Sequence, residues 1–103
     1  MQQTRPIKDR SPDEITTTLV DVGCDEPTIS AFQRLAQYAR DENLGLTALA
    51  HQTGISTTTL SQCYGGSYAG DYSAIADRIE QFFWRLEQKA LYGGLRTFAE
   101  TNI

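Results

Sequence analysis

The fold class follows most directly from residues 46–71, which read Leu-Thr-Ala-Leu-Ala-His-Gln-Thr-Gly-Ile-Ser-Thr-Thr-Thr-Leu-Ser-Gln-Cys-Tyr-Gly-Gly-Ser-Tyr-Ala-Gly-Asp. We expect Thr47 to cap a short helix at its N-terminus. Gly54 lies where the chain must then turn sharply, and glycine adopts a positive φ there without steric cost. Ile55 fills the corner, and Ser56 caps a second short helix. The stretch therefore predicts two short helices that cross closely at a tight turn.

Short polar side chains occupy the expected outer face of the second helix. In a helix-turn-helix unit, that face enters the major groove of DNA. Hydroxyl groups at the start of this helix and in the following loop, with backbone amides at the start of the third helix, would hold phosphates. The spacing also fits an ordinary helical hairpin without a nucleic-acid role, and that alternative stays open. The candidate DNA-binding residues are Ser56, Thr57, Thr58, Ser61, Gln62 and Tyr68.

Residues 65–70, Gly-Gly-Ser-Tyr-Ala-Gly, form a glycine-rich connection after the second helix. It does not read as a phosphate-cradling nucleotide loop, because no Gly-Lys-Ser or Gly-Lys-Thr follows it and no strand precedes it. Two interpretations remain: Tyr68 anchors a tight connection, or its hydroxyl and the neighbouring amides contact the DNA backbone.

The net charge of −4 limits the expected DNA affinity, because that affinity comes mostly from lysine and arginine near phosphates. Residues 46–70 contain no lysine, arginine, aspartate or glutamate. Arginines elsewhere, such as Arg34, Arg40 and Arg78, help only if folding brings them to the same side. Binding of duplex DNA should therefore be weak, salt-sensitive and largely independent of base sequence.

Length and composition predict one soluble globular domain. The chain has 103 residues, of which 40% are hydrophobic and 21% charged. No run approaches the roughly 18 apolar residues of a membrane span. The first ten residues lack the apolar segment of a secretion signal. We therefore expect a cytoplasmic location and no membrane partner.

Neither catalysis nor a cofactor is expected. Cys24 and Cys63 are too few for a zinc site or a disulfide framework, and we expect two reduced thiols, with Cys63 in the core. His51 is the one histidine, and an exposed helix position accounts for it. Carboxylates such as Glu80 and Glu87 fall at helix starts or on solvent faces, and no nucleophile has a base at a recognisable spacing. The sequence therefore predicts no catalytic residue, no metal site and no cofactor in this chain.

The remaining segments predict an all-α, lambda-repressor-like bundle of four to five helices. Residues 1–10 read as a flexible leader, residues 11–92 as the helical domain, and residues 28–92 as its core. Ser11 and Asp25 are expected to start the first two helices. The first helix contains three consecutive threonines, whose stiff side chains weaken it, so it is expected to be mobile.

The last helix is expected to begin after Asp71 and to run to about Tyr92, where the pair Gly93-Gly94 breaks it. Residues 93–103 then read as a linker at a boundary within a longer protein. Trp84 and Leu91 lie seven residues apart, off the core-facing stripe, and are candidate partner-interface residues. Either the first helix covers them, or a subunit or a neighbouring domain does. The core-facing stripe comprises Tyr72, Ala76, Ile79, Phe83, Leu86 and Ala90, with Ile75 and Phe82 at its edge.

Two runs within this pattern resemble one family in particular. Residues 55–62, Ile-Ser-Thr-Thr-Thr-Leu-Ser-Gln, and residues 66–71, Gly-Ser-Tyr-Ala-Gly-Asp, are similar to the N-terminal helix-turn-helix domain of the AAA+ transposition ATPases typified by the phage Mu target-DNA-binding protein B. Residues 95–101, Leu-Arg-Thr-Phe-Ala-Glu-Thr, are similar to the link that precedes the ATPase module in such proteins. The resemblance covers about residues 28–101.

The resemblance implies a bacterial or phage-encoded protein that binds ATP, assembles on DNA and delivers target DNA to a transposase. This chain contains no Gly-x-x-x-x-Gly-Lys-Ser/Thr, so none of the ATP chemistry is expected of it. The family commonly places lysines on both sides of the loop tyrosine, where Ser67 and Ala69 stand here. That departure weakens the expected hold on phosphates.

Three functions follow as expectations. The first is an accessory domain that binds duplex DNA weakly. The second is a protein-interaction domain of the same fold, in which Trp84 and Leu91 mediate homo-oligomerisation or dock on the ATPase module. The third is a phage-repressor-like transcriptional regulator, which would need a dimer and a preferred palindromic site.

Overall fold

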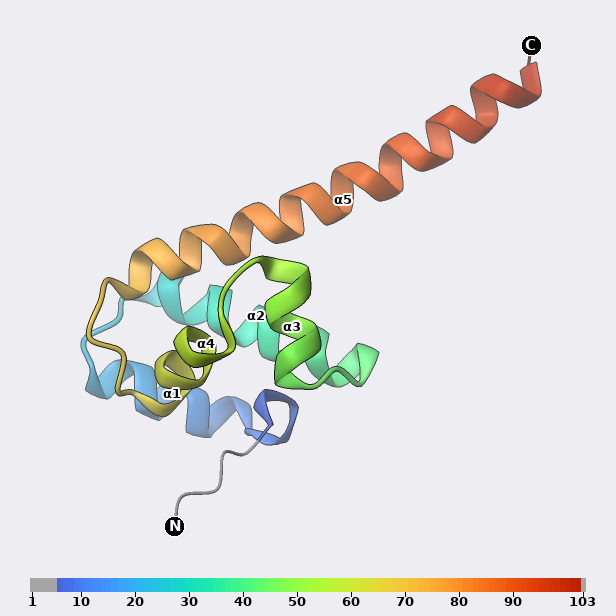
Figure 1. Ribbon diagram of the computed structural model, residues 1–103. Coiled ribbons are helices and arrows are strands. Elements are labelled where there is room, and N and C mark those ends of the chain that lie inside the picture. Colours follow the sequence, from blue (N-terminus) through green and yellow to red (C-terminus); the bar gives the residue numbers. More distant parts are fainter. Residues whose placement is uncertain (1–5, 103) are drawn as a thin grey trace.

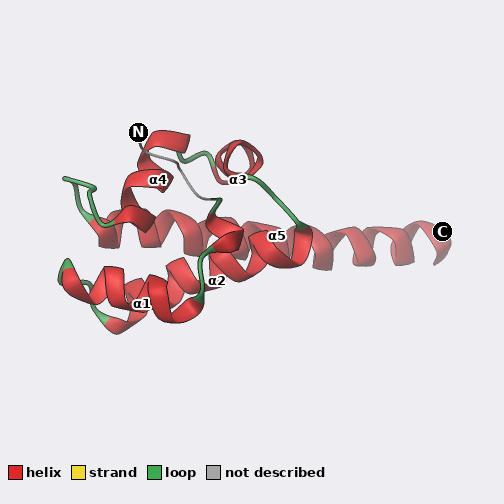
Figure 2. Cartoon of the chain, turned by 90° about the horizontal axis from the view of Figure 1, so that it is seen from below, coloured by secondary structure: helices red, strands yellow, loops and turns green. Residues whose placement is uncertain are grey.

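The fold is all-helical over the part of the chain that is described. The computed structural model describes residues 6–102, with side chains as far as Ala90, and contains no strand in that range. Figure 2 shows the helices joined by short loops. The elements are the 3-10 turn η1 (Ile7–Asp9) and the helices α1 (Pro12–Asp21), α2 (Glu26–Glu42), α3 (Leu46–Thr53), α4 (Thr57–Gly65) and α5 (Tyr72–Asn102).

The predicted helix starts at Ser11 and Asp25 are confirmed. Ser11 Oγ accepts a hydrogen bond from the backbone N–H of Glu14 at 3.1 Å. Asp25 Oδ1 accepts one from the N–H of Thr28 at 3.2 Å. Each oxygen satisfies an N–H that has no partner inside the first turn of its helix.

The expected cap at Thr47 is wrong. α3 begins at Leu46, two residues earlier than a cap at Thr47 predicts, and its N-cap is Gly45, which has no side chain to make a cap hydrogen bond. Thr47 is therefore the second residue of the helix rather than the residue before it. Without a capping side chain, α3 depends on packing against its neighbours for its stability.

The first helix and part of the expected leader pack on the core. Ile15 and Leu19 of α1 are buried, and α1 contacts both α2 and α4. Within the leader, Ile7 is buried, and Lys8 Nζ donates to Asn43 Oδ1 at 2.6 Å. The buried positions of Ile7, Ile15 and Leu19 show that α1 and residues 6–10 of the expected leader contribute to the core. Residues 1–5 of that leader lie outside the described residues.

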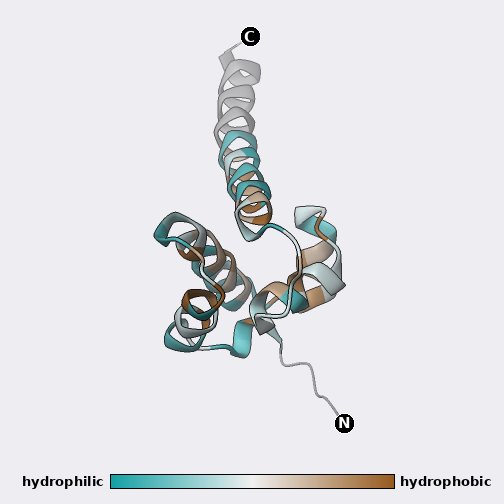
Figure 3. Cartoon of the chain, turned by 90° about the vertical axis from the view of Figure 1, so that its left-hand side faces the viewer, coloured by the Kyte–Doolittle hydropathy of each residue, from teal (hydrophilic) through white to brown (hydrophobic). Residues whose placement is uncertain are grey.

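The core lies between α2, α4 and α5, with α1 against one side. Tyr64 of α4 is buried, and its hydroxyl donates to the carbonyl of Phe32 in α2 at 2.6 Å. The two rings meet edge to face with their centroids 5.3 Å apart. In Figure 3, apolar and polar segments alternate along the helices, as expected for helices that each bury one face.

α5 is longer than predicted. It continues through Gly93 and Gly94 to Asn102, so the expected end near Tyr92 is wrong and the expected linker is helical up to residue 102. Two glycines disfavour a helix by about 1 kcal/mol each but do not bar it sterically. The C-terminal part of α5 extends beyond the other helices, and the molecule measures 59 × 27 × 22 Å (Figure 1).

The core-facing stripe of α5 is buried along its first half only. Ile75, Ile79 and Phe83 are buried against the other helices. Leu86 is 38% exposed, and Ala90 is exposed. The predicted stripe is therefore correct in its spacing, but the other helices do not cover its last two positions.

Candidate nucleic-acid interface

The junction between α3 and α4 is three residues long and begins with Gly54. Gly54 has φ 76° and ψ 11°, the left-handed conformation predicted for it, and its N–H donates to the carbonyl of Ala50 at 2.9 Å. Ile55 is buried, as predicted. Thr53 Oγ1 donates to the carbonyl of Leu49 at 2.8 Å and accepts from the N–H of Ile55 at 3.2 Å. This buried hydroxyl holds both sides of the turn.

Arg78 of α5 also holds the turn. Its Nη2 donates to the carbonyl oxygen of Gly54 at 2.7 Å. This contact ties the long helix to the junction and places a guanidinium group beside it. The roles of Thr53 and Arg78 at this turn were not predicted from the sequence. A threonine at the end of a helix, just before a left-handed glycine, was the only available signal for Thr53.

The buried and exposed faces of α4 are those predicted. Leu60, Cys63 and Tyr64 are buried against the core. Ser56 is the N-cap: its Oγ accepts from the N–H of Thr59 at 3.1 Å and donates to Thr59 Oγ1 at 2.9 Å. The Ser56 hydroxyl is therefore engaged in capping, which reduces its capacity to hold a phosphate.

The outer face of α4 carries the four predicted groove-contacting side chains. Thr58 and Gln62 are exposed, while Thr57 and Ser61 are half-buried. All four line a shallow hollow of about 440 Å³ between α4 and the start of α3. Leu46 and Thr47 of α3 complete its lining. The structure thus brings these four residues together on one accessible surface, and Ser56 and Tyr68 do not line it.

Tyr68 packs on its own loop and on α5. Its ring meets that of Tyr72 edge to face at a centroid distance of 5.5 Å, and its N–H donates to the Tyr72 hydroxyl at 3.1 Å. The ring also covers Gly70, where a Cβ atom would lie 2.5 Å from the Tyr68 hydroxyl oxygen. These contacts support the anchoring interpretation of Tyr68, and glycine at position 70 makes the close approach possible.

The arginines expected to assist DNA binding, Arg34, Arg40 and Arg78, form hydrogen bonds or ion pairs with other parts of the protein. Arg34 pairs with Glu87 at 2.9 Å and with Glu80 at 3.7 Å, and its guanidinium carbon lies 4.2 Å from the centroid of the Phe83 ring. Arg40 donates to the carbonyl of Arg10 at 2.8 Å. Arg78 is the one that reaches the α3–α4 junction. The outer face of α4 therefore receives little positive charge from the fold.

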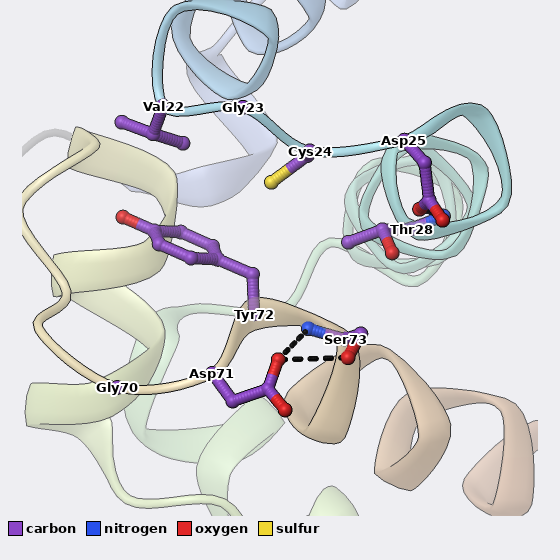
Figure 4. Close-up of a pocket in the computed structure, with 9 residues that line it drawn as sticks. All are labelled: Val22, Gly23, Cys24, Asp25, Thr28, Gly70, Asp71, Tyr72 and Ser73. Carbon is purple, nitrogen blue, oxygen red and sulfur yellow. Dashed lines mark hydrogen bonds between the residues drawn. The ribbon is translucent and has the colours of Figure 1, made fainter.

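A second hollow, of about 340 Å³, lies where the chain enters α2 and α5 (Figure 4). Two carboxylates line it, and both are used in helix capping. Asp71 Oδ1 accepts from the N–H and the hydroxyl of Ser73 at 2.9 and 2.7 Å, and these bonds lower the pKa of Asp71. The hydroxyl and the N–H of Thr28 lower the pKa of Asp25 in the same way. Over the described residues, no group of three or more metal-ligating side chains occurs.

Both cysteines are free thiols. Cys63 is buried in α4, and burial raises the pKa of its thiol to about 12. Cys24 lines the hollow of Figure 4 and is half-buried, and burial followed by the charge of Asp25 raises its pKa. The expectation of two unpaired cysteines is confirmed.

Trp84 stands apart from all of these contacts. It is 61% exposed on α5, so α1 does not cover it, although the sequence had left that possibility open. Leu91, its expected companion, lies outside the residues whose side chains are described.

Comparison of the chain with protein-family models, curated proteins and solved structures gives no match. None of the helices within residues 6–102 combines the length and the apolar character needed to span a membrane.

Proposed function

We propose that α3, the turn at Gly54 and α4 form a helix-turn-helix unit that binds duplex DNA without catalysing a reaction. The observation that carries this proposal is the orientation of α4, which buries its apolar face and leaves a polar face accessible. In such a unit the second helix lies in the major groove. The three-residue connection with a glycine also fits the motif. The side chains directed at base edges are then Thr57, Thr58, Ser61 and Gln62.

The chemistry of these four side chains favours weak and permissive recognition. A hydroxyl group both donates and accepts hydrogen bonds, so it contacts several bases without strong preference. Only Gln62 has an amide that can bond two atoms of one base. The domain therefore binds many sequences with similar affinity.

Phosphate contacts come mainly from the start of α4. The first backbone N–H groups of a helix have no partner within it, and they favour an anion at this end. Arg78 lies beside the turn that precedes α4 and supplies positive charge there. Ser56 and Tyr68 contribute less than their positions in the sequence suggest, because both are engaged in local contacts.

The family resemblance supports an accessory role within a transposition ATPase. In that setting, the domain adds DNA contacts while a separate module binds ATP and addresses the transposase. The glycine-tyrosine loop and the Leu-Ser-Gln run in α4 carry this part of the proposal. The weak affinity expected here suits a domain that acts together with other DNA contacts in one assembly.

A titration of labelled duplex DNA at low and at moderate salt tests the proposal. The wild-type chain should bind at low salt and release the duplex at moderate salt. The double variant Thr58→Ala and Gln62→Ala should bind roughly tenfold more weakly, as expected when a good side-chain contact is lost. The matched control is Thr17→Ala with Gln81→Ala, which removes exposed residues of the same types from α1 and α5. No binding at low salt, or equal loss in both double variants, would exclude the proposed interface.

A second function rests on a different observation, the exposure of Trp84. In this alternative the fold serves as a protein-interaction or oligomerisation domain, and α5 supplies the contact. The two functions are compatible, because the α4 surface and the Trp84 surface share no residue.

A further inference from the structure

The charged residues of α5 separate onto two sides of the helix over residues 72–90. The cations there recur at steps of seven and four residues, which places them within about 40° of one another around the helix axis. The acidic residues lie on the other side. The cations are Arg78, Arg85 and Lys89, and the acidic residues are Asp77, Glu80 and Glu87. The protein therefore has a local positive surface along α5, although its net charge is −4.

This positive side borders a hollow of about 430 Å³ between α5 and α3. The two helices pack on each other beside it (Figure 1). Phe82 and Leu86 give the hollow an apolar floor, and Leu86 is 38% exposed there. The polar side chains that line it are Gln52, Arg85 and Lys89.

Each polar side chain in this lining has hydrogen-bond donors available. Within residues 6–90, Arg85 and Lys89 take part in no hydrogen bond or ion pair, and both are exposed. The Gln52 amide oxygen accepts from the Tyr38 hydroxyl at 2.7 Å, which leaves the N–H groups of that amide to face a ligand. No acidic residue lines the hollow among the described residues. The lining therefore offers donors and positive charge and requires an acceptor that is negatively charged.

We propose that this hollow binds an acidic segment of a partner protein. One apolar side chain of the segment contacts Leu86 and Phe82, and carboxylates on either side of it bond to Arg85 and Lys89. Carboxylates only accept hydrogen bonds, so they match a lining that donates them. The floor favours a peptide over a nucleic acid, because a phosphate backbone has no apolar group to cover Leu86.

The hollow and the proposed DNA-binding surface lie on different sides of α3. Thr47 lines the hollow beside α4, and Gln52 lines the hollow beside α5. These two residues are five positions apart, which is about 140° around the helix axis. A partner segment and a duplex can therefore bind at the same time, and this proposal does not depend on DNA binding.

The contact is expected to be weak and to depend on salt. Ion pairs between exposed side chains contribute little individually and are screened by salt. The net negative charge of the chain repels an acidic segment, so any binding has to come from a local positive surface.

An anisotropy titration at low salt tests the proposal with a labelled peptide, Glu-Glu-Glu-Leu-Glu-Glu-Glu. The wild-type chain should bind it. Arg85→Gln with Lys89→Gln should weaken binding by roughly fivefold or more. Lys8→Gln with Arg34→Gln, which removes the same residue types and the same charge from η1 and α2, should have much less effect. No binding to the wild type, or equal losses in the two double variants, overturns the proposal.

The apolar floor has its own test. Leu86→Ala should weaken binding of the same peptide by roughly threefold. A peptide with serine in place of the leucine should bind the wild type more weakly and should not distinguish the wild type from Leu86→Ala. Equal affinity of the leucine and serine peptides would overturn the seating of an apolar side chain on this floor.

The same variants distinguish an acidic segment from the two other possible occupants. The Arg85 and Lys89 double variant should bind duplex DNA no more weakly than its charge-matched control. A larger loss for DNA than for the peptide would assign these cations to the duplex and overturn the proposal. Sedimentation of the chain alone covers the second case, since self-association abolished by this double variant would make a second copy the occupant. Peptide binding with the expected variant effects, but no DNA binding, would remove the α4 interface and leave this one in place.

Discussion

Gly54 holds a backbone conformation that a residue with a side chain adopts only under strain. Its φ of 76° lies in the left-handed region. A Cβ atom at this position would find its nearest neighbour, Arg78 Nη2, at 3.9 Å, which is ordinary contact. The cost of a side chain at Gly54 is therefore almost entirely a backbone cost.

Replacing Gly54 by alanine should lower the free energy of unfolding by about 1 kcal/mol, the penalty of the left-handed conformation. Urea unfolding of the wild type and of Gly54→Ala measures the change. Gly65→Ala is the matched control, because Gly65 is helical and a Cβ atom there meets nothing within 4 Å. That control should be neutral or slightly stabilising. Equal losses would mean that the junction does not depend on its glycine.

The two thiols should differ in reactivity. The pKa of Cys63 is about 12, so almost no thiolate exists at pH 8 in the folded protein, and burial also blocks access. Cys24 is partly accessible, although its pKa is raised as well. Alkylation at pH 8, followed by mass spectrometry, should label Cys24 first and Cys63 only after urea is added. Labelling of Cys63 at the rate of Cys24 would show that α4 does not stay packed.

Residues whose contacts lie within their own turn or helix cap could be predicted from the sequence. Gly54, Ile55 and Ser56 take the places expected of them, because turns and caps depend on nearby backbone atoms. The contacts of Arg78 and Tyr68 join separate segments, or fold a loop back on itself, and no local pattern marks them.

Among the helices, α5 packs on the core with its N-terminal part and extends past the other helices with its C-terminal part. Its first half packs on α2, where Arg34 lies over the Phe83 ring and pairs with two glutamates of α5. Farther along the helix, Leu86 of the core-facing stripe is 38% exposed. The helix therefore contributes to the core through residues 75–83, and its cover is incomplete from Leu86 to Ala90.

Alanine substitutions at two positions of the core-facing stripe should differ in their effect on the free energy of unfolding. Phe83→Ala removes a buried ring and should cost about 3 kcal/mol or more, whereas Leu86→Ala removes a partly exposed side chain and should cost less than about 1 kcal/mol. Thermal or urea unfolding at a concentration where the chain is monomeric measures both. A larger loss at Leu86 would place the boundary of the core beyond that residue.

Helix starts were easier to predict than helix ends. Ser11 and Asp25 are polar caps whose oxygens must lie next to free N–H groups, so the sequence marks them clearly. The pair Gly93-Gly94 was taken as a stop, but glycine only weakens a helix unless it adopts a positive φ. Gly54 and Gly66 do adopt positive φ and do end α3 and α4, respectively.

Over the whole molecule, the acidic charge and the engagement of the basic residues work against the proposed binding of DNA. The chain has a net charge of −4, and the outer face of α4 carries no cation. Lys8, Arg34 and Arg40 bond to other parts of the protein. Few counterions are therefore displaced when this surface meets a duplex.

Binding should weaken as salt is added, but less steeply than for a DNA-binding surface rich in lysine and arginine. A plot of the logarithm of the association constant against that of the salt concentration should have a slope smaller in magnitude than about 3, since only a few phosphates are neutralised. Anisotropy titrations over several low salt concentrations give this slope. A much steeper slope would reveal a basic surface elsewhere on the chain as the true contact.

The all-α class and the helical core could be predicted because the apolar residues recur at helical spacing in nearly every segment. The charge balance of the candidate site could not, because it depends on which arginines fold back onto the protein. Arg34 and Arg40 look available in the sequence but are engaged in the structure.

The most direct test of the account is to map the DNA contact on an isotope-labelled sample by NMR. Amide signals are compared before and after addition of a short duplex at low salt. The account predicts that the largest shifts fall on residues 56–62 and on the Gly54 turn, with little change on α1 and α2. Shifts confined to α5 or to the surface of α1, or no shifts at all, would contradict it.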